Sequence, residues 1–234
     1  MKPVERGPSP KVYSAYGDAK PDLIARLGMH CSYCEASADP QNLAVEHIYP
    51  KKPHPARALL WSNFLISCNT CNSYKGIHLG NGKCKNLFVR YLWPHLENTF
   101  RAYKYHPDGS VDVRTGVTGE TLDAAKRTLD MAGLVLSSAN AASYQKLGLV
   151  YDGLSKRKQQ WGQIVGFRTR YEREPTPDNV DFVATNAALM GYFSIWMEAF
   201  EQHPEVRRAL IRAFQADPAC FDRRTTMPVR KGRI

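Results

Sequence analysis

The chain has 234 residues, of which 43% are apolar and 23% are charged, and this ordinary globular composition excludes a wholly disordered or fibrous protein. Lysine and arginine number 32 against 22 acidic residues, which gives a formal charge of +10. This balance favours a polyanion such as nucleic acid as the partner, although a basic surface without a function remains the alternative.

The sequence lacks a stretch that is long and apolar enough to span a membrane. Its longest apolar run, residues 187–200, contains Glu198 and falls short of the roughly 20 residues that a bilayer span needs. Residues 1–14 include Lys2 and Arg6 but not the apolar segment of a secretory signal. We therefore expect a cytoplasmic protein without membrane contact.

The first half of the chain predicts short helices and strands. Residues 1–18 are rich in proline and glycine with little periodicity, which indicates an arm on the surface or partly ordered. Residues 21–27 then predict a short helix with a proline at its start and a glycine after its end. Strands are predicted at residues 43–50 and 64–67, and a helix from about residue 69 to residue 76 completes a β-β-α unit.

The second half predicts one hairpin and then helices. Residues 100–113 look like a β-hairpin with residues 107–109 at its turn. From Thr118 onward the apolar residues recur at helical spacing, so the boundary between a mixed N-terminal unit and a helical C-terminal unit is predicted near residues 112–120. Three further helices are predicted, over residues 141–173, 180–201 and 204–215.

Four of the six cysteines form two C-x-x-C pairs, Cys31 with Cys34 and Cys68 with Cys71. Cytosolic thiols stay reduced, so this spacing is typical of a metal site rather than a disulfide framework. Four thiolates fill a tetrahedral zinc shell, and the predicted zinc is therefore structural; buried, unligated cysteines are the alternative. The two other cysteines have no partner at ligand spacing and are predicted to be unligated thiols: Cys84 and Cys220.

The 33 residues between the two pairs contain Glu46 and His47 at a predicted strand end, and then Asn63. Asn72 directly follows the second pair, and Lys75 lies three residues further on. A histidine titrates near neutral pH and can take a proton from water. Taken alone, however, His47 is more often an ordinary histidine at a strand end, and Asn72 is more often a helix cap.

At these residues the sequence resembles the HNH nucleases with zinc knuckles. The motifs that carry the resemblance are CSYC at 31–34, VEHIYP at 45–50, WSN at 61–63 and CNTCNSYKG at 68–76. The intervals of fifteen residues between His47 and Asn63 and of eight between Asn63 and Asn72 are similar to the family's spacing. The resemblance implies an α+β fold with a ββα-metal core and structural zinc, followed by a mainly helical C-terminal region. It also implies an endonuclease that hydrolyses phosphodiester bonds, with DNA favoured over RNA.

The resemblance also assigns roles to individual residues. His47 would be the general base, and Asn63 would bridge the loop so that His47 points at the phosphorus. Glu46 and Asn72 would bind a catalytic cation, and Lys75 would reach the substrate phosphate. Some relatives have histidine in place of Asn72, so the oxygen-rich set here favours Mg²⁺ or Mn²⁺ over zinc at the catalytic site.

A basic loop follows the proposed base and allows two interpretations. Lys51 and Lys52, with His54 and Arg57, would line a groove for nucleic acid and bind the substrate. A proline-rich basic loop is equally compatible with a solvated surface without such a role.

A longer part of the chain is similar to the HNH subunits of prokaryotic anti-phage systems, of the Septu type and its retron-associated relatives. It adds PHLENTFRAYKYHPDGSV at 94–111 and DAAKRTLDMAGL at 123–134. In that family the nuclease works with an ATPase subunit, so the resemblance implies an antiviral effector. The helical region would dock this partner or cover the substrate, or it would only stabilise the site.

The sequence thus predicts four parts, an N-terminal arm (1–18), an HNH nuclease domain (19–115), a helical accessory region (116–220) and a loosely ordered basic tail (221–234). Two rival functions lack intrinsic catalysis. One is a zinc-stabilised nucleic-acid-binding module, and the other is a regulatory subunit that becomes active only with an ATPase partner.

Overall fold

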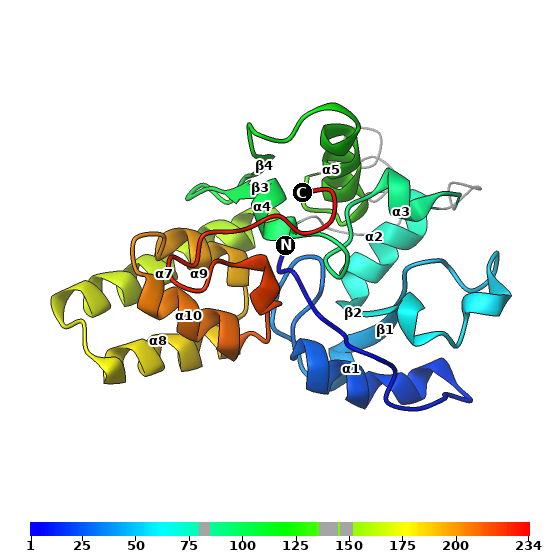
Figure 1. Ribbon diagram of the computed structural model, residues 1–234, viewed down its shortest axis with the longest axis horizontal. Coiled ribbons are helices and arrows are strands. Elements are labelled where there is room, and N and C mark those ends of the chain that lie inside the picture. Colours follow the sequence, from blue (N-terminus) through cyan, green and yellow to red (C-terminus); the bar gives the residue numbers. More distant parts are fainter. Residues whose placement is uncertain (80–84, 136–144, 146–151) are drawn as a thin grey trace.

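The computed structural model describes residues 1–79, 85–135, 145 and 152–234. Within these residues the strands form two separate two-stranded sheets among many helices, so the fold is mixed α and β as predicted. The C-terminal helices gather on one side of the molecule, and the first sheet lies on the other (Figure 1).

The first sheet lies between two helices of the N-terminal part. The elements in order are α1 (Lys20–Leu27), β1 (Leu43–His47), β2 (Phe64–Cys68) and α2 (Asn69–Leu79). The strands pair antiparallel with Glu46 opposite Leu65. All four lie close to their predicted positions, but α2 continues past Gly76 to Leu79. Leu79 is buried, and its packing outweighs the weak helix propensity of glycine.

A second hairpin and a helix follow. The elements are α3 (Leu87–Arg90), α4 (Thr99–Ala102), β3 (Tyr103–Tyr105), β4 (Val111–Val113) and α5 (Gly119–Met131). The predicted hairpin is confirmed, and its turn is closed by the amide of Gly109, which donates to the carbonyl of His106 at 2.9 Å. Helices α3 and α4 were not predicted, because a single turn is too short for apolar periodicity to register.

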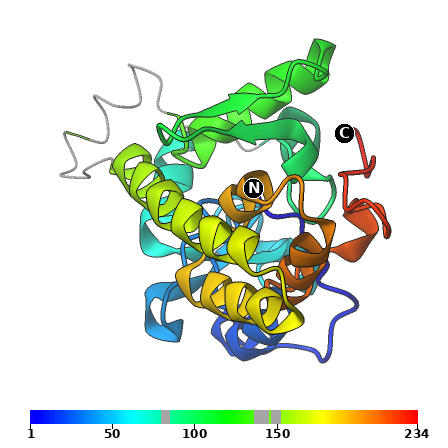
Figure 2. The same ribbon diagram turned by 90° about the vertical axis from the view of Figure 1, so that its left-hand side faces the viewer.

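Within residues 152–234 the chain forms four α-helices: α7 (Gly153–Arg173), α8 (Pro177–Met190), α9 (Phe193–Ala199) and α10 (Pro204–Ala213). Helix α8 packs on α10, and α7 packs on α9 (Figure 2). The earlier part of the helix predicted over residues 141–173 lies largely outside the described residues.

The prediction of one helix over residues 180–201 is wrong, because the helix is interrupted between α8 and α9. Gly191 at the break has a φ of +82°, and its backbone lies against the loop that follows the first cysteine pair. A Cβ atom at Gly191 would lie 2.5 Å from the amide nitrogen of Ser37. A tertiary contact therefore ends α8 where the local sequence would continue it.

The same loop starts the next helix. The carbonyl of Glu35 accepts a hydrogen bond from the amide of Tyr192 at 2.8 Å. The Glu35 carboxylate accepts hydrogen bonds from the amide and the hydroxyl of Ser194 at 2.8 and 2.6 Å. A carboxylate at the first turn of α9 satisfies amides that the helix leaves free.

The N-terminal arm is anchored at its first four residues, which are buried, while most of residues 5–18 are exposed on the surface. Val4 is fully buried, and the ammonium of Lys2 donates to the carbonyls of Leu27 and Phe214 at 2.7 Å each. These carbonyls lie at the ends of α1 and α10. Composition missed this because two or three anchoring residues suffice to fix a polar segment.

The basic tail is also anchored at a few residues, while most of its residues are exposed. The side-chain amide of Asn98 donates to the carbonyls of Cys220 and Val229 at 2.6 and 2.8 Å, and Ile234 is buried. The tail therefore takes part in the tertiary structure despite its charge.

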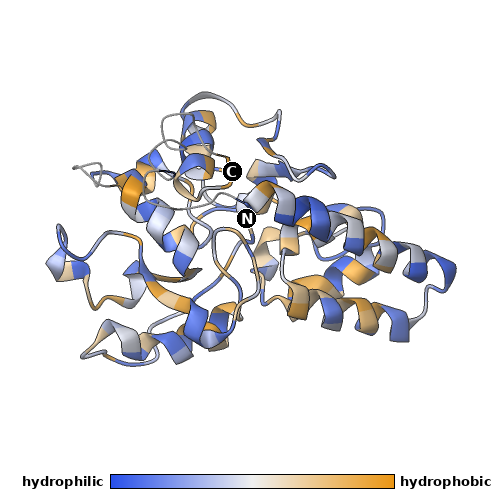
Figure 3. Cartoon of the chain, turned by 180° about the vertical axis from the view of Figure 1, so that it is seen from behind, coloured by the Kyte–Doolittle hydropathy of each residue, from blue (hydrophilic) through white to orange (hydrophobic). Residues whose placement is uncertain are grey.

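The helices carry both hydrophobic and hydrophilic residues, as helices half-buried in a core do (Figure 3). Trp93 and Trp196 are the largest fully buried side chains. Among the helices of the described ranges, none is long and apolar enough to cross a membrane.

Candidate metal and catalytic site

The four cysteines of the predicted zinc site lie together. Their Sγ atoms are all within 4.8 Å of one another, and those of Cys34 and Cys68 are 3.9 Å apart. A tetrahedral zinc with Zn–S bonds of about 2.3 Å places its sulfurs about 3.8 Å apart. The amide of Ser32 donates to the carbonyl of Ile66 at 2.9 Å and ties the first pair to β2. The cluster therefore fits a zinc ion.

The thiols of the cluster interact strongly. Hydrogen bonds from Cys31 and the other two sulfurs lower the pKa of Cys68. The hydrogen bond with Cys31 raises the pKa of Cys34, and it does the same for Cys71. The cluster thus favours the thiolate, the form of cysteine that binds metal, at Cys68.

Cys220 lies outside this cluster, as predicted. Its Sγ is 3.6 Å from Oδ2 of Asp217, and burial raises its pKa to about 12. Cys84 lies outside the described residues.

His47 is the last residue of β1, and its side chain is held by one hydrogen bond and two aromatic contacts. Its Nε2 is 3.0 Å from the carbonyl oxygen of Ala58, and its ring meets those of Phe64 and Tyr16 edge-on. A carbonyl oxygen only accepts, so Nε2 carries the proton and Nδ1 carries the lone pair of the neutral ring. Burial lowers the pKa of His47, which favours this neutral form at neutral pH.

Glu46 is buried and is held at one carboxylate oxygen. The hydroxyl of Tyr33 donates to Oε1 at 3.0 Å, and the ammonium of Lys75 forms an ion pair with the same oxygen. Lys75 also donates to the backbone carbonyl of His47. One lysine therefore contacts both residues of the proposed acid-histidine pair.

A pocket of about 220 Å³ brings His47 together with Glu46, Asn72 and Lys75. The residues that line it are Tyr16, Val45, Glu46, His47, Pro50, Lys51, Asn72, Lys75 and Gly76. A carboxylate and an amide in one small pocket are suitable donors for a hard cation, which keeps waters as its further ligands. The pocket therefore offers two oxygen donors of the kind that Mg²⁺ or Mn²⁺ prefers.

Asn63 lies beside this pocket rather than in its lining. Its Oδ1 accepts from the amide of Tyr49 at 2.8 Å, and its Nδ2 donates to the carbonyls of Tyr49 and Arg57 at 3.0 Å each. Ala58, which holds His47, directly follows Arg57. The Asn63 amide thus spans the loop between the strands, and its effect on catalysis stays a prediction.

The three lysines that were predicted to bind substrate differ in their surroundings. Lys75 is only 4% exposed and turns toward Glu46, because a buried carboxylate needs a nearby positive charge. Lys51 is exposed at the pocket, with its Nζ 4.3 Å from the centre of the Tyr16 ring. Lys52 is exposed and does not line the pocket. Only Lys51 combines exposure with a place in the pocket.

Two aromatic residues of the site were missed by the sequence analysis. Tyr16 meets the His47 ring and lines the pocket, but it lies in a segment without periodicity that gave no signal. Tyr33 contacts Glu46. Its position between Cys31 and Cys34 was the signal in the sequence that could have pointed to it.

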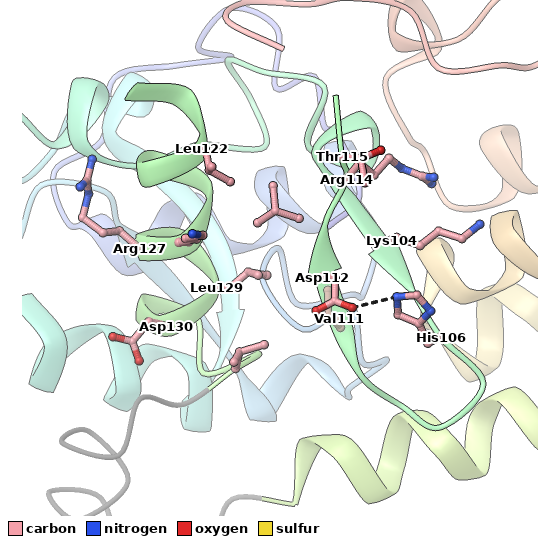
Figure 4. A pocket seen from close by; sticks show the side chains of 13 residues that line it. Lys104, His106, Val111, Asp112, Arg114, Thr115, Leu122, Arg127, Leu129 and Asp130 are labelled. Atoms are coloured by element: carbon pink, nitrogen blue, oxygen red, sulfur yellow. Dashed lines mark ion pairs between the residues drawn. The ribbon is translucent and has the colours of Figure 1, made fainter. Parts of the chain in front are cut away.

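A larger pocket lies elsewhere, between the β3–β4 hairpin and α5, with a volume of about 990 Å³ (Figure 4). Several of its charged side chains are already paired. His106 and Asp112 are 3.1 Å apart, while Lys104 and Arg114 both contact Glu198. The pocket holds none of the predicted site residues, so the smaller pocket at His47 is the candidate site.

Comparison with known proteins gives a match to part of the chain. No protein-family model matches the chain. A segment of 58 residues is 42% identical to the Septu protein PtuB of Bacillus thuringiensis. The match covers 24% of this chain and 23% of that protein. The chain is thus similar to a defence-system protein over about a quarter of its length.

Proposed function

We propose that this protein is a metal-dependent HNH endonuclease that hydrolyses phosphodiester bonds, with DNA favoured over RNA as the substrate. The observation that carries the proposal is the pocket in which His47, Glu46 and Asn72 meet, next to a cluster of four cysteines. The preference for DNA rests on the resemblance to HNH nucleases.

In this proposal each residue has a distinct task. His47 takes a proton from the attacking water at Nδ1, because Nε2 is occupied by the Ala58 carbonyl. Glu46 and Asn72 hold Mg²⁺ or Mn²⁺, which, when bound, offsets negative charge on the phosphoryl oxygen and the leaving group. Asn63 keeps the loop in place.

Substrate binding is assigned to the exposed lysines next to this pocket. Lys51 lies at its edge and Lys52 follows directly, so both would contact phosphates that flank the cleaved bond. The formal charge of +10 supports a nucleic-acid partner.

We also propose that the nuclease acts in anti-phage defence with an ATPase subunit. The similarity to the Septu protein PtuB supports this role. The helical region would dock the partner or cover the substrate.

A second candidate is a zinc-stabilised nucleic-acid-binding or regulatory subunit without its own catalysis. The ion pair between Lys75 and Glu46 favours this candidate, because an ammonium already balances the carboxylate that would bind the cation.

A cleavage assay separates the two candidates. Purified protein, alone and with a candidate ATPase subunit, is incubated with plasmid DNA or RNA in Mg²⁺, Mn²⁺ or a chelator. The nuclease proposal predicts metal-dependent cleavage by the wild type that His47→Ala loses. Retained nucleic-acid binding without cleavage under every condition would support the second candidate instead.

A further inference from the structure

The two donors that hold Glu46 come from the two halves of the cysteine cluster. Tyr33 lies inside the first cysteine pair, and its amide is 3.5 Å from the Sγ of Cys31. Lys75 lies on α2, four residues and about one helical turn after Cys71. Each half of the cluster therefore carries one donor to the same carboxylate.

Both donors contact the same oxygen of that carboxylate. The hydroxyl of Tyr33 and the ammonium of Lys75 meet at Oε1 of Glu46, and all three side chains are at least 96% buried. In the part of the chain that the structure describes, the contacts to Glu46 thus fix Oε1, while the residue lines the pocket of His47. Oε2 is left as the oxygen for a cation.

We propose that the four-cysteine site controls cation binding at Glu46 through Tyr33, which acts as a positioning residue. The inference rests on the proposed nuclease function and adds a form of regulation to the same pocket. A filled cysteine site holds the CSYC loop against β2 and so keeps the hydroxyl of Tyr33 on Oε1. Without metal in the cysteine site this hydroxyl is released, and the cation site is weakened.

Removing the hydroxyl of Tyr33 is the most specific test of this link. Tyr33→Phe removes one oxygen atom and keeps the packing of the ring. Tyr171→Phe is the matched control, because the Tyr171 hydroxyl also donates to a carboxylate, Oε1 of Glu205, at 2.5 Å and lies outside the pocket.

The measurement is the dissociation constant of Mn²⁺, read from the electron paramagnetic resonance of free Mn²⁺ with full-length, zinc-loaded protein. Tyr33→Phe should bind Mn²⁺ about ten-fold or more weakly, as expected when a residue that orients a metal ligand is lost. Its zinc content and helical circular dichroism should match the wild type. Tyr171→Phe should bind Mn²⁺ like the wild type.

The outcomes separate this inference from the proposed function. If the wild type binds Mn²⁺ and cleaves nucleic acid while Tyr33→Phe binds Mn²⁺ equally well, the link is wrong and the nuclease proposal stands. If the wild type binds no Mn²⁺, both are wrong.

A second measurement covers the case in which Tyr33→Phe does not fold. Fluorotyrosine placed at position 33 of the wild-type chain keeps the hydroxyl. Its ¹⁹F resonance should shift when Mg²⁺ is added, and the same label at position 171 should not respond. An unchanged resonance at position 33 overturns the inference.

Discussion

At the scale of single residues, Lys75 stabilises the buried carboxylate of Glu46. The pair is almost fully buried, with side-chain exposures of 4% and 2%. Removing one partner of a buried ion pair leaves an uncompensated charge, which costs about 3–5 kcal/mol. Lys75→Met should therefore lower the free energy of unfolding by about this amount in urea titrations.

Lys156→Met is the control for this prediction, because Lys156 pairs with Asp152 at an exposed position. It should cost less than about 1 kcal/mol. An equally small effect at Lys75 would mean that its ammonium faces solvent, as direct contact with substrate would require.

His95 predicts a pH dependence of stability. Burial, with a smaller effect from the nearby Arg6 and Lys231 charges, lowers the pKa of His95 to about 2. In the unfolded chain the pKa is about 6.5. Below pH 6.5 the unfolded chain therefore binds a proton that the folded chain does not. The contribution of His95 to the free energy of unfolding is fully present above pH 6.5. Below that pH it falls by about 1.4 kcal/mol for each pH unit.

The substitution His95→Leu should remove this contribution and flatten the acid side of the stability curve. Urea titrations at pH 7, 6 and 5 measure it. If the free energy of unfolding changes equally with pH in the wild type and the variant, His95 takes up a proton in the folded state.

The sequence predicted the main residues of the candidate site, but not how they contact one another. Glu46, His47 and Asn72 lie in one pocket because a hairpin and the following helix bring them together through local chain geometry. The inward turn of Lys75 and the contact from Tyr33 depend on burial, which residue spacing does not encode.

At the scale of elements, Gly191, between α8 and α9, packs against the loop that follows the first cysteine pair. A side chain there is strained by the φ of +82° and would meet backbone atoms of Ser37 and Glu35. Gly191→Ala should lower the free energy of unfolding by about 1–3 kcal/mol, measured by urea titration.

Gly162→Ala in α7 is the matched control, because a Cβ atom there meets nothing within 4 Å. It should raise the free energy of unfolding by about 0.5–1 kcal/mol, since alanine loses less backbone entropy than glycine in a helix. If the two substitutions change the free energy of unfolding in the same direction and by the same amount, the contact of Gly191 with residues 35–37 does not cause the interruption of the helix.

Elements that carry a local sequence signal were predicted best. The β1–β2 pair, α2 and the β3–β4 hairpin were recognised from local signals such as alternation and turn residues. The break between α8 and α9 was not, because its cause lies far away in the chain at Glu35 and Ser37. The contacts that anchor the arm and the tail were missed for the same reason.

At the scale of the whole molecule, the cysteine cluster lies where the sheet, α2 and the start of α9 meet. Zinc there should stabilise the entire fold, because Glu35 in the adjacent loop also caps α9. Metal analysis should find about one zinc per chain. Removal with a chelator should lower the melting temperature and reduce hydrogen-exchange protection in α9. A zinc-free protein with unchanged melting temperature would contradict this prediction.

The central claim is that His47 acts as the base of a metal-dependent nuclease. The most direct test is the rate of plasmid cleavage at saturating Mg²⁺, compared between the wild type and His47→Ala, with any required partner present. A positioned general base contributes about 10²–10⁴-fold, so the variant should be slower by that factor while retaining its fold and its zinc. Equal rates for the two proteins, or no cleavage by either, would contradict the claim.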